Sequence, residues 1–195
     1  MTPSTTNAQR ERDTDHRYGS SGEHALQQAV GSADRAEKFY DDQVLDRLNE
    51  AMIAFVGRME MAFVATADRH GNCDSSFHAG PPGFLHVIDE RTVAYPAPHD
   101  DDMPESLADI VENPHVGIVL LDFVTDLIGL HINGAARVVE DADLRATVDR
   151  LPTGTGRWIV VTVDEAYIHC RKHIPRMVPA GRSRAAGSGG APAAS

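Results

Sequence analysis

Residues 61–96 decide the fold and read MAFVATADRHGNCDSSFHAGPPGFLHVIDERTVAYP. Two strand-like runs flank the sequence His70-Gly71-Asn72, which is typical of a tight turn. After the Gly-Pro bend that begins at Gly80, two more strand-like runs flank Asp89-Glu90-Arg91. The stretch therefore predicts four short strands joined by short turns, which is the pattern of an antiparallel sheet.

The following segments add longer strands and short helices. The sequence predicts helices over residues 103–112 and 141–151, and strands over 115–123, 127–141 and 156–170, the last as one strand or a pair. Asn113-Pro114 ends the first of these helices, and Gly134 marks a place for a bend or bulge in its strand. Together these elements predict a mainly β protein with short helices, built as a closed or partly closed antiparallel barrel.

Composition divides the chain into four parts. Residues 1–22 are polar and are expected to be a disordered tail, whereas residues 23–58 carry apolar side chains at helical spacing. We therefore expect a helical extension that packs on the barrel. The barrel domain spans residues 59–178, and residues 179–195 form a flexible tail rich in Gly, Ala and Ser.

Charge and cysteine content exclude several classes of function. The net charge of −11 argues against binding to nucleic acid or to an anionic membrane surface, which need clustered Lys and Arg. The two cysteines, Cys73 and Cys170, are too few for a disulfide framework. With no signal peptide and no apolar run long enough to span a membrane, the sequence predicts a cytoplasmic protein.

Four segments resemble the pyridoxamine 5′-phosphate oxidase-like family. They are DSSFHAGPPGFLHVIDERTVAYP, SLADIVENPHVGIVLLDF, IGLHINGAARVVED and VDEAYIHCRKHIP, and the resemblance runs from about Glu23 to Pro175. It implies the FMN-binding type of split β-barrel and a homodimer that holds FMN in a cleft between its subunits. Some members of this family use haem or the deazaflavin F420 instead, so these two remain alternatives.

The resemblance also suggests which residues bind the cofactor. The candidates are Ser75, Ser76, His78, Gly80, Tyr95, His99, Ser106, His131, Asn133 and His169. No catalytic acid or base is identified. His169 and the adjacent Cys170 face opposite sides of a strand, so we expect no metal site there.

Two departures from the family pattern weaken the expected phosphate site. His78 stands where related sequences have an Arg, and Asp100–Asp102 replace a basic, glycine-rich loop before the helix that contains Ser106. Carboxylates close to a phosphate repel it. The acidic run has three interpretations: a site for a hard cation, a change of ligand, or a solvated loop in which Asp102 and Glu105 cap the helix.

The sequence therefore predicts an FMN-dependent oxidoreductase with an unknown small-molecule substrate. Pyridoxamine 5′-phosphate oxidase activity itself is not expected, because basic residues that would hold a phosphorylated substrate are not evident. The alternative is a non-catalytic split-barrel binding protein that has lost FMN, or a relative that uses haem or F420.

Overall fold

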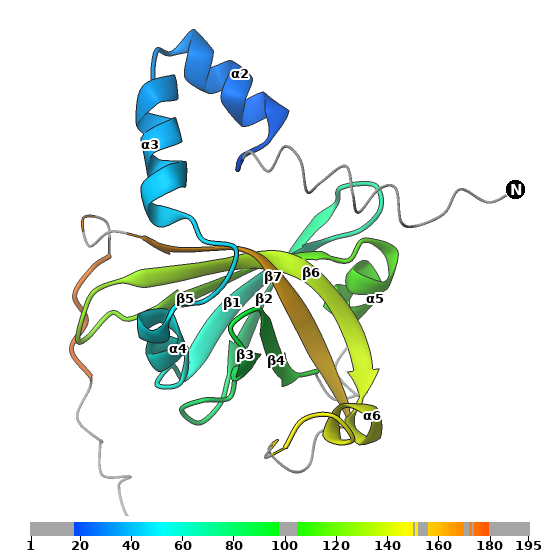
Figure 1. Ribbon diagram of the computed structural model, residues 1–195. Coiled ribbons are helices and arrows are strands. Elements are labelled where there is room, and N and C mark those ends of the chain that lie inside the picture. Colours follow the sequence, from blue (N-terminus) through cyan, green and yellow to red (C-terminus); the bar gives the residue numbers. More distant parts are fainter. Residues whose placement is uncertain are drawn as a thin grey trace, which may run out of the picture.

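The computed structural model describes residues 18–97, 105–149, 151, 156–169, 172 and 174–179. The helices of this part are α2 (Ser21–Ala29), α3 (Ala33–Gln43), α4 (Glu50–Val56), α5 (Glu105–Glu112) and α6 (Asp141–Arg145). The strands are β1 (Met61–Ala67), β2 (Cys73–Ala79), β3 (His86–Asp89), β4 (Thr92–Pro96), β5 (His115–Leu121), β6 (Gly129–Glu140) and β7 (Arg157–His169) (Figure 1). None of the helices described here is long and apolar enough to cross a membrane.

All seven strands form one antiparallel sheet in the order β2-β1-β5-β6-β7-β4-β3. The long strands β6 and β7 bend across the molecule and bring the two ends of this order toward each other (Figure 1). Within the described residues the edge strands β2 and β3 do not pair, so the barrel remains split. The predicted antiparallel split barrel is confirmed, and its last segment is one strand of 13 residues.

Gly134 marks a break in the pairing of β6 with β7, as the sequence suggested. The register shifts between Asn133 and Gly134. A Cβ atom at residue 134 would collide with the carbonyl oxygen of Thr162 on β7, so glycine allows the two backbones to approach closely here.

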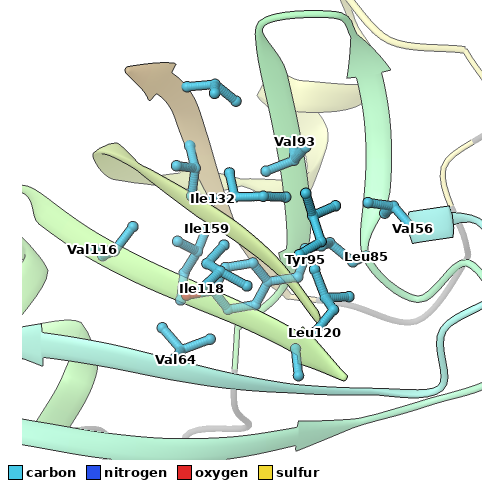
Figure 2. Packing of buried hydrophobic residues seen from close by; sticks show 14 of the residues in the cluster. Val56, Val64, Leu85, Val93, Tyr95, Val116, Ile118, Leu120, Ile132 and Ile159 are labelled. Atoms are coloured by element: carbon cyan, nitrogen blue, oxygen red, sulfur yellow. The ribbon is translucent and has the colours of Figure 1, made fainter. Parts of the chain in front are cut away.

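The core lies inside the curled sheet. In β1 and β5 every second residue is buried, which places Val64, Val116, Ile118 and Leu120 on the inner face. Figure 2 shows these side chains packed around the ring of Tyr95 from β4. Helix α4 adds three buried side chains to this core: Met52, Phe55 and Val56.

A second, smaller core surrounds the only tryptophan of the chain. The side chain of Trp158 is 0% exposed and packs with Leu144 of α6 and Leu151. Its indole N–H donates a hydrogen bond of 2.8 Å to the Asp141 carboxylate. Helix α6 ends at Arg145, well before the predicted residue 151. The chain then turns, and the Thr147 hydroxyl donates a hydrogen bond to the Leu144 carbonyl oxygen.

The three N-terminal helices differ in how they meet the barrel. Helix α4 is buried on one face, whereas α2 and α3 contain no buried residue and project from the barrel in Figure 1. We call residues 18–43 the helical arm. The chain between the arm and α4 is held on the sheet at Leu45, which exchanges backbone hydrogen bonds of 2.9 and 2.7 Å with Ala166 on β7.

Candidate functional site

The predicted cofactor residues lie on both faces of the sheet. On β2, Ser76 and His78 are opposite Val64 and Ala62, whose side chains point into the barrel. Ser75 is opposite Ala65 on the outer face. Alternation along a strand separates neighbouring side chains in this way, so the structure divides the predicted residues into an inner and an outer group.

The inner group is centred on His78. Its Nε2 atom lies 3.0 Å from the Ser76 hydroxyl oxygen, and its ring meets the ring of Tyr95 edge-on at 5.0 Å. Burial lowers the pKa of His78 from its usual value of 6.5. The imidazole is therefore mainly neutral at pH 7 and does not supply the positive charge of an arginine.

Tyr95 belongs to the core of the barrel. Its side chain is 1% exposed, and its buried hydroxyl has no hydrogen-bond partner among the described residues. Burial raises the pKa of this hydroxyl, so it stays protonated. The structure gives Tyr95 a packing role under the half-buried His78.

Gly80 directly follows β2, and Ser106 lies in the first turn of α5. A Cβ atom at Gly80 would come within 2.6 Å of the Cβ of Phe84, so glycine permits the tight Gly-Pro bend. Ser106 is buried at the start of α5. This helix is attached to β1 by a hydrogen bond of 2.8 Å from the Thr66 hydroxyl to the Asp109 carboxylate.

The outer face carries a continuous apolar row across five strands. Neighbouring members are direct cross-strand partners, and we call them the outer stripe: Phe77, Phe63, Val119, His131 and Tyr167. Phe63 is 39% exposed and Phe77 is 58% exposed, and their rings lie 5.4 Å apart. Large apolar side chains that are exposed next to one another make this face a candidate surface for binding a ligand or another protein.

His131 and Asn133, both predicted cofactor residues, belong to this outer face. The ring of His131 stacks on that of Tyr167 at 4.6 Å, and the Asn133 amide donates a hydrogen bond of 3.2 Å to Glu165. Burial and the nearby Glu165 carboxylate raise the pKa of Tyr167. The stripe thus ends in an aromatic pair next to a fixed carboxylate.

A hollow of about 430 Å³ lies beside the outer stripe. The small side chain of Ala65 and the backbone of Gly117 contribute to its lining, which also includes Asn133, Asp164 and Glu165. No Lys or Arg is among the described residues that line this outer hollow. Its charge therefore disfavours a phosphate group.

The remaining predicted residues are only partly described. His99 and the run Asp100–Asp102 lie outside the described residues, so the structure does not place the acidic loop. His169 is the last residue of β7, and its backbone pairs with Gly129. In the part of the chain that the structure describes, no group of three or more His, Cys, Asp or Glu side chains is arranged to hold a metal ion.

Sequence reasoning did not identify Phe63, Phe77 and Tyr167. A signal for Phe63 was present, because β1 reads MAFVATA and is apolar at successive positions. A strand with one solvated face would alternate apolar and polar residues, whereas a strand covered on both faces does not. The run therefore indicated a covered outer face as well as a buried inner one.

The fold defines a split-barrel protein whose outer face exposes aromatic side chains. Residues 48–170 match the sequence model of the family described as pyridoxamine 5′-phosphate oxidase. Because this match covers well over half of the chain, the protein belongs to that family, as the resemblance in its sequence predicted.

Several solved structures are similar to this chain. HupZ of Group A Streptococcus is 18% identical with a TM-score of 0.47, over 61% of this chain and 91% of HupZ. The haem storage protein HutZ of Vibrio cholerae is 17% identical with a TM-score of 0.42, over 63% and 94% of the chains. An FAD-binding protein of Mycobacterium smegmatis is 16% identical with a TM-score of 0.43, over 63% and 95%. No curated protein sequence matches this chain.

Proposed function

We propose that the protein is an FMN-dependent oxidoreductase that binds its cofactor on the outer face, between two copies of the chain. The observation that carries this proposal is the outer stripe. Its side chains form an apolar and aromatic surface in register across five strands. A planar ring system packs well on such a surface, because aromatic side chains bind through offset stacking and edge contacts.

Exposure of the stripe supports the homodimer. Phe63 and Phe77 expose large apolar side chains next to one another on the outer face. Two copies that meet through this face would remove both residues from water in each subunit, and an interface of this kind is self-complementary. The cofactor would then lie at the edge of the contact, where both subunits can reach it.

The residues present fit the ring of a flavin better than its phosphate. Bound FMN would supply hydride chemistry. The stripe would hold and orient its ring, while the Asn133–Glu165 pair would place a hydrogen-bonding carboxylate beside it. Neutral His78 and the outer hollow, which lacks Lys and Arg among its described residues, do not offer a cation to the phosphate. We therefore expect contacts with the flavin ring, and not contacts with the phosphate, to supply most of the affinity for FMN.

An absorbance spectrum of the purified protein is the first test, followed by titration with FMN and, separately, with riboflavin. We expect micromolar binding of both, with less than about a tenfold loss for riboflavin, because the phosphate contributes little. Absence of a flavin spectrum together with absence of FMN binding, with and without Mg²⁺, would rule out the proposal.

A non-catalytic binding protein is the second candidate, and the charge of the outer hollow favours it. Asp164 and Glu165 are the acidic residues in its described lining, which suits a neutral or cationic ligand better than FMN. A haem-binding protein would instead need an axial ligand, for which the half-buried His131 on the outer stripe is the candidate. A Soret band in the same spectrum, lost in His131→Ala, would identify this alternative. F420 carries a phosphate and acidic groups, so the same hollow disfavours it.

A further inference from the structure

Strand β2 lies at one edge of the sheet. Within the described residues it pairs with β1 on one side and has no partner on the other. Its seven residues follow β1 in unbroken register and include no Lys, Arg or Pro. Natural proteins use such residues, or a break in register, to prevent an edge strand from pairing with another chain. Strand β2 has none of these protections.

The opposite edge of the sheet, strand β3, is protected. It has only four residues, and its register with β4 shifts between Val87 and Asp89. Short length and broken register both hinder the addition of a further strand. Of the two edges, β2 is therefore the one suited to extend the sheet.

The backbone groups of β2 point alternately to β1 and to the free edge. At the two ends of this pairing, the Gly80 N–H donates to the Glu60 carbonyl oxygen at 2.9 Å, and the Asp68 N–H donates to that of Asn72 at 3.0 Å. Hydrogen-bonded and non-hydrogen-bonded pairs alternate in an antiparallel ladder, so these two bonds fix the pattern between them. The even-numbered residues of β2 bond to β1, whereas its odd-numbered residues direct their N–H and C=O groups to the free edge.

We propose that the β2 strands of two copies of the chain pair antiparallel about a two-fold axis at Ser76, which joins the two sheets into one. This inference rests on the homodimer of the proposed function and names the strand through which its copies meet. Ser76 is the middle residue of β2, so the register pairs all seven residues of both strands. It also brings the odd-numbered residues opposite one another, and their outward backbone groups exchange hydrogen bonds across the contact.

Side chains on the inner face are complementary in this register. Asp74 lies opposite His78 of the partner subunit, and directly opposite residues share a face of the sheet. The Asp74 carboxylate makes no hydrogen bond or ion pair with a described residue, and the contact of His78 with Ser76 uses Nε2 and not Nδ1. The Nδ1–H of the imidazole can therefore donate to the carboxylate, and the two-fold axis makes this pair twice.

On the outer face the same register covers Phe77, which is 58% exposed in the single chain. Its ring lies opposite Ser75 of the partner subunit and diagonal to Phe77 of the partner subunit, a separation that aromatic side chains can span. The outer stripes of the two copies then run end to end. The surface proposed for the flavin ring becomes continuous across the dimer.

Cysteine cross-linking of the full chain tests the register, in a Cys73→Ser background. In Ser76→Cys the two new thiols are direct partners, with about 4.5 Å between Cα atoms, which is within the range of a disulfide. Mild oxidation without FMN should convert most of this chain to a covalent dimer on a non-reducing gel. Ser75→Cys is the matched control, because residue 75 is more exposed but lies diagonal to its copy, about 7–8 Å away. We expect it to cross-link at least about tenfold more slowly.

Sedimentation velocity of Ser75→Pro tests the backbone bonds. The Ser75 N–H points to the free edge, so proline removes a hydrogen bond of the contact and none between β2 and β1. We expect the dissociation constant of the dimer to rise about tenfold or more. Ser75→Ala keeps the N–H and should sediment like the wild type.

Three results would overturn the pairing: a monomeric wild type, cross-linking of Ser76→Cys no faster than that of Ser75→Cys, or a Ser75→Pro chain of native circular dichroism that sediments like the wild type. A dimer that fails only the cross-linking test would meet through another surface, which leaves the homodimer of the proposed function in place. Because the cross-link forms without FMN, rapid cross-linking of Ser76→Cys supports the pairing even if the flavin titration rules out the proposed function.

Discussion

The ring of His131 lies parallel to the ring of Tyr167, with 4.6 Å between their centroids and 7° between their planes. The two residues are cross-strand partners on β6 and β7. The ring of Phe39 from the helical arm meets Tyr167 edge-on at 5.6 Å. Tyr167 therefore joins the outer stripe of the barrel to an arm that is otherwise exposed.

Tyr167→Ala should loosen the helical arm. Loss of two aromatic contacts should lower the free energy of unfolding by about 1 kcal/mol and should increase hydrogen exchange of the α3 amides more than that of β5. Tyr167→Phe keeps the ring and should behave like the wild type. Unchanged hydrogen exchange of the α3 amides in Tyr167→Ala would show that the contact between Phe39 and Tyr167 does not stabilise the helical arm.

Replacing the exposed aromatic pair of the outer stripe tests the proposed homodimer. We expect Phe63→Ser with Phe77→Ser to shift the chain to monomer in sedimentation velocity, because a self-complementary interface loses four large apolar side chains. Val111 on α5 is 76% exposed and does not belong to the stripe, so Val111→Ser is the matched control. A double variant that sediments like the wild type would place the dimer contact elsewhere.

Gly134→Ala should destabilise the barrel by about 1–3 kcal/mol or more, because the new methyl group would meet backbone atoms of Thr162 that cannot move aside easily. Urea denaturation followed by the fluorescence of buried Trp158 measures this change. Gly156→Ala introduces the same methyl group where the described residues, apart from its chain neighbours, have no atom within 4 Å, so its effect should be small. Equal stability of the two variants would contradict a close contact at the β6 bulge.

Asp122 should make the stability of the fold depend on pH. Burial alone would raise the pKa of Asp122, but backbone N–H groups of residues 124–126 donate to it at 2.8–3.0 Å and Arg58 lies 3.5 Å away. These contacts hold the pKa of this carboxyl below its usual value of 3.8. Because its pKa is lower in the folded state than in the unfolded chain, the ionised carboxylate stabilises the fold above about pH 4. This stabilisation is lost as the pH falls through the pKa of the folded state.

Asp122→Asn should therefore reduce the free energy of unfolding at pH 7 and reduce its decline between about pH 4.5 and 2. Urea denaturation at several pH values measures both effects. Asp149→Asn removes an exposed carboxylate that makes no hydrogen bond with a described residue, so it serves as the control. If the free energy of unfolding of Asp122→Asn still falls as steeply with pH as that of the wild type, other carboxyl groups cause the acid sensitivity.

Local patterns in the sequence were sufficient for most elements of the barrel. Turn residues and strand-like runs predicted β1 to β4, and Gly134 predicted the bulge in β6. The helical spacing of apolar residues over 23–58 misled in one place, because residues 44–49 do not form a helix. There the backbone pairing of Leu45 with Ala166 outweighs the helical spacing of the side chains. That pairing joins residues far apart in the chain, and no local pattern encodes it.

The sequence by itself determined the antiparallel split barrel and the family, because side-chain alternation, turns and motif order are properties of short segments. Only the tertiary structure decided which candidate residues share a surface. It separated Ser76 and His78 from His131 and Asn133, and it aligned Phe77, Phe63 and Val119 with His131 and Tyr167. The physical reason is strand register: a shift of one residue moves every side chain to the other face, and register is set by pairing between segments distant in the chain.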